Sequence, residues 1–201
     1  MTDARFDEKL GISTGGFKEW DSDQPHYHRY EPTSYEVLEY LFERYKLKRG
    51  DKFVDFGSGK GRVAIYVHHR FKIPVVGIEA QADVHALAML NRQCYRTRAG
   101  KTRVRVHFEH GLAEDYLIKP DENRFYFFNS FSVDVFQEVL VNIAASLKEA
   151  NRDVHLILYY PMPSYTKVMS EQPLFEIHKE IKLPDTSDRR ERILIYRSTE
   201  R

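Results

Sequence analysis

Apolar and polar positions along the chain predict an alternation of strands and helices that begins at Asp51. Five short apolar runs have the length of buried strands: FVDF, PVVGIE, VRVHF, RFYFFN and VHLILYY. Between them, apolar residues recur three and four positions apart, which is the spacing of one helix face. These stripes are Val63, Val67 and Phe71; Ala86, Leu87, Leu90 and Cys94; and Phe136, Val139, Leu140, Ile143 and Leu147. Such alternation favours a mostly parallel sheet covered on both faces.

The chain ahead of Asp51 divides into two parts. Residues 1–32 are polar and show no clear period, so we expect an N-terminal segment there, with a lid as one interpretation. A helix is predicted over residues 33–45, because Pro32 precedes it and Thr33 with Glu36 forms a capping-box pattern. Its apolar stripe consists of Val37, Leu38, Leu41 and Tyr45.

The last forty residues predict a hairpin. LFEIHKEI and RILIYR are strand-like, and the polar turn PDTSDRR joins them without a helix. The predicted fold class is therefore α/β, a doubly wound and mostly parallel seven-stranded sheet with a C-terminal antiparallel hairpin. Residues 33–201 are expected to form one domain.

Composition narrows the class of protein. The chain has 201 residues, 42% hydrophobic and 30% charged, which suits one packed domain. The formal net charge of +1 argues against a purely electrostatic nucleic-acid coat. A single cysteine, Cys94, excludes an internal disulfide framework and a multi-cysteine metal site. Without a signal-peptide pattern or an apolar run of ~18 residues, the protein is expected to be soluble and cytoplasmic.

The glycine-rich stretch from Val54 to Arg62 carries the main chemical signal. A buried strand ends near Asp55. It is followed by three glycines at alternate positions, Gly57, Gly59 and Gly61, with Ser58 between the first two, and a helix then begins. The spacing fails the phosphate-binding P-loop pattern and the dinucleotide fingerprint. An acid before the loop repels a diphosphate but attracts a cation such as an ammonium.

This loop resembles the first motif of class I S-adenosylmethionine-dependent methyltransferases, and the resemblance covers about 150 residues. It implies S-adenosyl-L-methionine as cofactor, with Asp55 facing its ammonium. Glu79, which ends the second strand, would accept the ribose hydroxyls; the alternative is a surface acid at a helix N-terminus. Tyr159-Tyr160-Pro161 is similar to a pattern in small bacterial methyltransferases of unassigned substrate.

Two further strand ends supply candidates through the same resemblance. After the third strand, Gly111-Leu112-Ala113 stands where the family often has Gly-Asp-Ala, so Leu112 replaces the adenine-contacting acid. Either Glu114 or backbone amides, with Ala113 among the candidates, would then contact adenine; helix capping is the alternative for Glu114. After the fourth strand, Asn129 would orient the acceptor and the Phe131 ring would stack on it. A helix N-cap at Asn129, Ser130 or Ser132 is the competing interpretation.

The segment before the first predicted helix supplies the remaining candidates. In the family this segment often closes over the methionine end of the cofactor, which makes Tyr30 and Thr33 candidate ligands. Thr33 is equally explained as a helix cap. His26 and His28 resemble half of a metal site, but no carboxylate or cysteine cluster accompanies them, so no metal is expected.

A run of basic residues suggests RNA as one acceptor. No acid occurs from Val84 through Phe108, whereas the basic residues there are Arg92, Arg96, Arg98, Lys101, Arg103 and Arg105. Such a patch fits phosphates, and it also fits a helix C-terminus. The leading hypothesis is methyl transfer to RNA, protein or a small molecule. A non-catalytic cofactor-binding or partner-regulating protein is the alternative, and a nicotinamide oxidoreductase is disfavoured by the glycine spacing.

Overall fold

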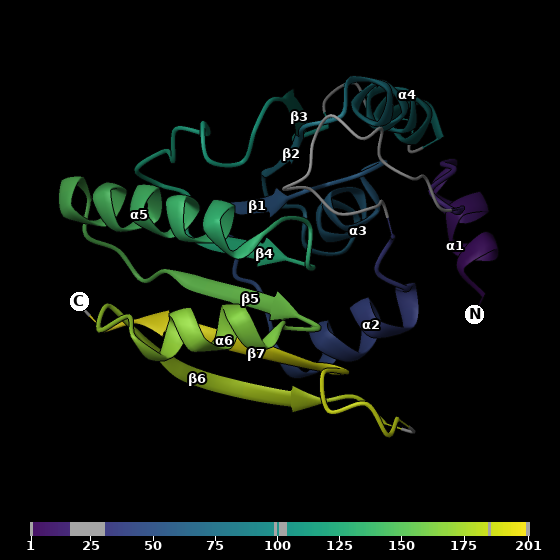
Figure 1. Ribbon diagram of the computed structural model, residues 1–201. Helices are drawn as coiled ribbons and strands as arrows, with labels where there is room; N and C mark the ends of the chain where they lie inside the picture. Colours follow the sequence, from purple (N-terminus) through teal and green to yellow (C-terminus); the bar gives the residue numbers. More distant parts are fainter. Residues whose placement is uncertain (1, 17–30, 99, 101–103, 185, 200–201) are drawn as a thin grey trace.

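The computed structural model describes residues 2–16, 31–98, 100, 104–184 and 186–199, and it contains one seven-stranded sheet (Figure 1). The strands are β1 (Phe53–Phe56), β2 (Val75–Glu79), β3 (Val106–His110), β4 (Arg124–Phe127), β5 (His155–Tyr159), β6 (Phe175–Lys182) and β7 (Arg192–Ser198). Their order is β3-β2-β1-β4-β5-β7-β6. Strands β1 to β5 are parallel, and β7 runs antiparallel to both β5 and β6. The predicted fold class is confirmed.

Helices cover both faces of the sheet. They are α1 (Asp3–Leu10), α2 (Tyr35–Arg44), α3 (Arg62–Phe71), α4 (Ala82–Arg98), α5 (Val133–Glu149) and α6 (Pro163–Ser170). On one face, helices α1, α2, α3 and α4 pack against sheet residues such as Phe53 and Ile157. On the other face, helices α5 and α6 pack against the adjacent strand residues Val54 and Leu156. Adjacent strand residues point to opposite faces, so both faces of each central strand are apolar.

The entry to the sheet differs from the prediction in two respects. Helix α1 was not predicted, yet Phe6 and Leu10 are buried in the core. Helix α2 begins at Tyr35, and its cap is Ser34, whose hydroxyl accepts a hydrogen bond from the Val37 amide at 3.3 Å. The expected Thr33 cap was wrong because that hydroxyl has another partner, described below.

Helix α4 buries the opposite face from the predicted one. Its buried residues are Val84, Ala88, Asn91 and Tyr95, whereas Leu90 is 57% exposed and Cys94 is also exposed. Hydrogen bonds of two polar side chains explain which face of α4 is buried. The Asn91 amide donates to the Ser13 and Lys60 carbonyls at 3.0 and 2.9 Å, and the Tyr95 hydroxyl lies 3.1 Å from His68 Nδ1. Apolar residues occupy both faces, so periodicity alone did not distinguish them.

The connection between β3 and β4 and the character of the helices complete the description of the fold. Residues 111–123, all of them described, join β3 to β4 without a helix. Among the described helices, none combines the length and apolar character needed to cross a membrane.

Candidate cofactor site and active-site cavity

The glycine loop connects β1 to α3 through a tight turn. The backbone amides of Gly57 and Ser58 both donate to the Ile78 carbonyl at 2.9 Å. Gly57, Gly59 and Gly61 have φ angles of 75°, 55° and 86°, in the left-handed region that favours glycine. A Cβ at Gly57 would overlap Ser130, and one at Gly61 would overlap the Phe108 ring. The loop therefore needs glycine for its backbone conformation and for close packing.

A cavity of about 390 Å³ opens at the carboxyl ends of the parallel strands, beside this loop. Of the predicted site residues, the lining includes Thr33, Asp55, Gly57, Ser58, Glu79, Ala113 and Asn129. Gly59, Gly61, Glu114 and Phe131 are not part of the lining. Tyr30, His26 and His28 lie outside the described residues.

Asp55 is a buried carboxyl group in the floor of the cavity. It is 2% exposed, and its Oδ2 atom has no hydrogen-bond partner among the residues that the structure describes. Burial and the nearby negative charge of Glu79 raise the pKa of Asp55 to about 8. A cationic ligand placed beside it would restore the charged form and supply the missing partner. The site thus fits an ammonium-bearing ligand.

Glu79 closes the other side of the glycine loop. Its Oε2 accepts a hydrogen bond from the Gly59 amide at 2.8 Å, and its Oε1 accepts one from the Gln81 amide at 2.9 Å. Burial raises the pKa of Glu79. Because a carboxylate can accept more hydrogen bonds than these two, Glu79 retains capacity for hydroxyl donors. Its position at the end of β2 makes it accessible from the cavity, unlike a purely surface acid.

The loop after β3 contributes backbone to the cavity. Gly111 and Ala113 line it, and the Gly111 amide donates to the Glu79 carbonyl at 3.0 Å. Glu114 is not part of the lining, and its backbone carbonyl accepts a hydrogen bond from the Asn142 side-chain amide at 2.6 Å. Of the two predicted alternatives for adenine contact, this geometry favours the backbone of the loop over the Glu114 side chain.

Asn129 and Phe131 follow β4 and point to different surroundings. Asn129 lines the cavity with a φ of 43°, in the left-handed region, and the α5 cap position is held by Ser132. Phe131 is 1% exposed, and its ring packs edge-on against Phe127 in the core. The prediction that the Phe131 ring stacks on an acceptor was wrong, because burial in this aromatic cluster removes the ring from the cavity.

Thr33 joins the entry segment to the sheet. Its hydroxyl lies 2.8 Å from the Tyr126 hydroxyl, and burial raises the pKa of Tyr126 well above its ordinary value. The Thr33 carbonyl accepts a hydrogen bond from Arg62 at 3.1 Å. Arg62 also pairs with Asp3 and donates to Thr14 at 2.6 Å. These contacts fix Thr33 beside the cavity.

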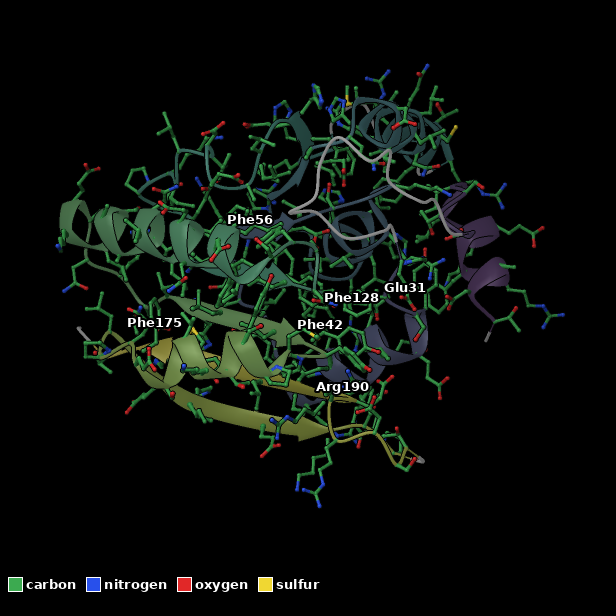
Figure 2. All side chains as sticks on the ribbon, in the orientation of Figure 1. Glu31, Phe42, Phe56, Phe128, Phe175 and Arg190 are labelled. Carbon is green, nitrogen blue, oxygen red and sulfur yellow. The ribbon has the colours of Figure 1, made fainter. Side chains whose placement is uncertain are left out.

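Several cavity residues were not among the predicted ligands. They include Glu31, Arg62, Phe128 and Glu191, whereas Tyr159 and Tyr160 were singled out only as part of a family pattern. Figure 2 shows Phe128 and Glu31 toward the same end of the sheet as Arg190, and Phe175 toward the opposite end. A usable signal existed for Phe128, since it directly precedes the candidate Asn129 at the carboxyl end of the predicted fourth strand. Glu191 carried none, because its position depends on how the hairpin pairs with β5.

The predicted basic patch lies away from the cavity. Arg92 donates to the Val106 carbonyl at 2.5 Å, and Arg105 donates to the Lys72 carbonyl, so both lie near the amino ends of β2 and β3. Arg96 and Arg98 occupy the last turn of α4; Lys101 and Arg103 lie outside the described residues. The cavity is at the carboxyl ends, roughly 15 Å farther along a five-residue strand.

The fold and the cavity define a class of protein. A doubly wound sheet with an acid-preceded glycine loop, and an acid at the end of β2, is the arrangement of a class I S-adenosylmethionine-dependent methyltransferase. Residues 26–199 match the family described as Histone methylation protein DOT1, and the chain belongs to that family. It is an S-adenosylmethionine-dependent methyltransferase, and the predicted enzyme class and cofactor are confirmed.

Solved structures show the same fold at low sequence identity. An RNA methyltransferase from Salinibacter ruber in complex with S-adenosyl-L-homocysteine is 16% identical, covering 84% of this chain and 92% of its own, with a TM-score of 0.56. A TehB-like SAM-dependent methyltransferase from Corynebacterium glutamicum is 15% identical, with 80% and 86% covered and a TM-score of 0.56. TrmN from Thermus thermophilus is 14% identical, with 83% and 49% covered and a TM-score of 0.60. Among curated proteins, none matches the chain significantly.

Proposed function

We propose that this methyltransferase acts on an amine nitrogen of a protein, namely the side chain of lysine. The observation that carries the proposal is the charge of the cavity. Among the residues that the structure describes, its lining contains four carboxyl groups, those of Glu31, Asp55, Glu79 and Glu191, and one cation, Arg62. The raised pKa of Asp55 keeps that carboxyl group neutral near pH 7 until a cation binds beside it. Arg62 is already paired with Asp3. Such a cavity attracts cations and repels phosphates.

The aromatic lining supports the same acceptor. Phe128 and Tyr159 pack with ring centroids 4.5 Å apart, and Tyr160 follows on the same wall. Aromatic faces stabilise ammonium and sulfonium cations, and they contact the methylene groups of a lysine side chain. The name of the matched family, Histone methylation protein DOT1, also points to a protein acceptor.

The proposed division of roles follows the strand order. Asp55 would bind the ammonium of the cofactor, the backbone of Gly57 to Gly61 would face it closely, and Glu79 would accept the ribose hydroxyls. Ala113 would contact adenine through its backbone. Thr33 would hold the entry segment near the methionine end, and Asn129 would orient the acceptor at the boundary between the two halves of the cavity.

The reaction that these residues would support is an in-line displacement. When bound, the cofactor supplies an electrophilic methyl group on a sulfonium. The neutral amine forms the new N–C bond while the C–S bond breaks, and the positive charge passes from sulfur to nitrogen. The side chains contribute by position: Asn129 offers a carbonyl oxygen to an amine hydrogen, and the aromatic wall excludes water.

RNA is the second candidate acceptor. Arg96 and Arg98 form part of an exposed basic patch, and the Salinibacter ruber protein of similar fold is named an RNA methyltransferase. The patch lies at the amino ends of the strands, so RNA would have to reach around the sheet to place a base in an acidic cavity. The lysine acceptor requires no such path.

The test is methyl transfer from cofactor labelled in the methyl group. Core histones, total cellular RNA and a metabolite extract are each incubated with the purified protein, and Asp55→Asn provides the matched control with weakened cofactor binding. We expect label in the histone fraction, recovered after acid hydrolysis as methyllysine. Label confined to RNA or to small molecules would overturn the lysine proposal and leave the enzyme class unchanged.

A further inference from the structure

The cavity has two halves that follow the order of the strands in the sheet. Asp55 and Glu79 belong to β1 and β2, and Gly111 follows β3, whereas Phe128 follows β4, Tyr159 ends β5 and Glu191 directly precedes β7. The sheet order β3-β2-β1-β4-β5-β7 places these groups along one edge. The first half holds the features that fit the cofactor. The second half is therefore the place for the acceptor.

Two carboxyl groups, those of Glu31 and Glu191, act on Tyr159 in this second half, and Glu191 is the one hydrogen-bonded to its hydroxyl. The Tyr159 hydroxyl donates a hydrogen bond to Glu191 Oε2 at 3.0 Å. Burial and the charge of Glu191 raise the pKa of Tyr159, so the phenol keeps its proton and remains a donor. One phenol does not exhaust the acceptor capacity of a carboxylate, and an ammonium group can bind to Glu191 as well.

The loop between β6 and β7 holds Glu191 in place. The Tyr160 amide donates to the Arg192 carbonyl at 3.0 Å, and the Tyr160 hydroxyl donates to Asp188 Oδ2 at 2.7 Å. Tyr160 has a φ of 49°, a left-handed conformation that these contacts on both sides maintain. Arg190 pairs with Asp188 at 2.9 Å and lies over the Tyr160 ring, so its charge is already neutralised. Glu191 thus remains the carboxylate that the loop presents to the cavity.

We infer that Glu191 selects the acceptor by binding its ammonium group, which makes the β6–β7 hairpin the specificity element of the enzyme. This inference rests on the proposed amine acceptor. The ammonium form binds between Glu191 and the rings of Phe128 and Tyr159, and it loses a proton to solvent before transfer. Attack by the neutral amine forms the N–C bond and breaks the C–S bond, so the product is again an ammonium beside Glu191.

The consequence is a linked effect on affinity and on pH dependence. A carboxylate beside a bound amine raises the pKa of that amine, since it favours the charged form. Removing the carboxylate weakens binding of the ammonium and lowers the pKa of the bound amine by the same free energy. A tenfold loss of affinity therefore corresponds to a shift of about one pH unit.

The experiment compares Glu191→Gln with wild type on core histones. Gln keeps an oxygen for the Tyr159 hydroxyl, so we expect an unchanged melting temperature and unchanged affinity for S-adenosylhomocysteine. The KM for histone should rise about tenfold, and the rising limb of the kcat profile should move about one unit to lower pH. Glu191→Asp, which retains the charge, should recover part of both effects.

The control is Glu180→Gln, which removes a carboxylate of the same hairpin outside the cavity. Glu180 pairs with Arg192 at 3.0 Å, and its loss should leave KM and the pH profile unchanged. Wild-type enzyme that methylates lysine, together with an unchanged KM and pH profile in Glu191→Gln, would overturn the role of Glu191 alone. Wild-type enzyme that labels no lysine would overturn the proposed acceptor and this inference together.

Discussion

Replacing Asp55 by Asn should stabilise the cofactor-free protein while weakening cofactor binding. Burial and Glu79 raise the pKa of Asp55 from 3.8 to about 8 in the folded protein. Between these two pKa values the unfolded chain has released the proton and the folded protein retains it. The stability of the wild-type protein therefore falls as the pH rises from about 4 to about 8, and the loss persists above pH 8.

The size of the effect follows from this window. At pH 7, about three units above the ordinary pKa, the penalty is about 4 kcal/mol. Asn does not ionise, but its buried amide lacks partners at a cost of about 1–3 kcal/mol. A net gain of about 2 kcal/mol remains, which raises the melting temperature by about 4–8 °C for a chain of this length. Near pH 5 the ionisation penalty of Asp55 and the cost of the buried Asn amide nearly cancel.

The assay is thermal unfolding followed by circular dichroism at pH 5 to 8, without cofactor, beside calorimetry with S-adenosylhomocysteine. We expect the gap in melting temperature to widen with pH and the ligand affinity to fall at least tenfold. Asp51→Asn is the matched control: Asp51 is equally buried but pairs with Arg124 at 3.1 Å, so its loss should destabilise by about 3 kcal/mol. A gap that stays constant with pH, or an Asp55 variant less stable than wild type at pH 8, would refute the reasoning.

Two further substitutions, with Gly111→Ala as the control for the first, test the loop and the strand end. Gly61→Ala should lower the free energy of unfolding by about 2–4 kcal/mol, because its Cβ would overlap the Phe108 ring at a left-handed φ. At Gly111 an added Cβ contacts no other atom, so Gly111→Ala should change the free energy of unfolding by less than about 1 kcal/mol. Asn129→Gly preserves the left-handed backbone and removes the amide, so turnover should fall about 100-fold with cofactor affinity within threefold of wild type; retained turnover in the folded variant would assign Asn129 to the scaffold.

The strands and the glycine loop were predictable because several signals agree there. The FVDF run, the acid at its end and three alternating glycines constrain one another, and β1 and its loop are where the sequence placed them. Two acids at neighbouring strand ends, Asp55 and Glu79, then had to meet, since parallel strands end at one edge of the sheet.

The failures occurred where local sequence supports two structures equally. Helix α4 has apolar residues on both faces, and Asn91 and Tyr95 decided the buried one through partners distant in the chain. Thr33 and Ser34 are both good caps, and the contact with Tyr126 selected between them. Glu191 reaches the cavity through antiparallel pairing with β5, which no local pattern encodes.

Helix α1 lies outside the matched residues 26–199, yet the contacts of Arg62 make it part of the same folding unit. Arg62 is the first residue of α3 and is 3% exposed, so its charge depends on Asp3 and on Thr14, whose hydroxyl in turn bonds Asp7. Withdrawing α1 would leave a buried guanidinium uncompensated, at a cost of about 3–5 kcal/mol. Proteolytic trimming or a bulky fusion at the first ten residues would thus loosen the start of α3, and through it the glycine loop that lines the cavity.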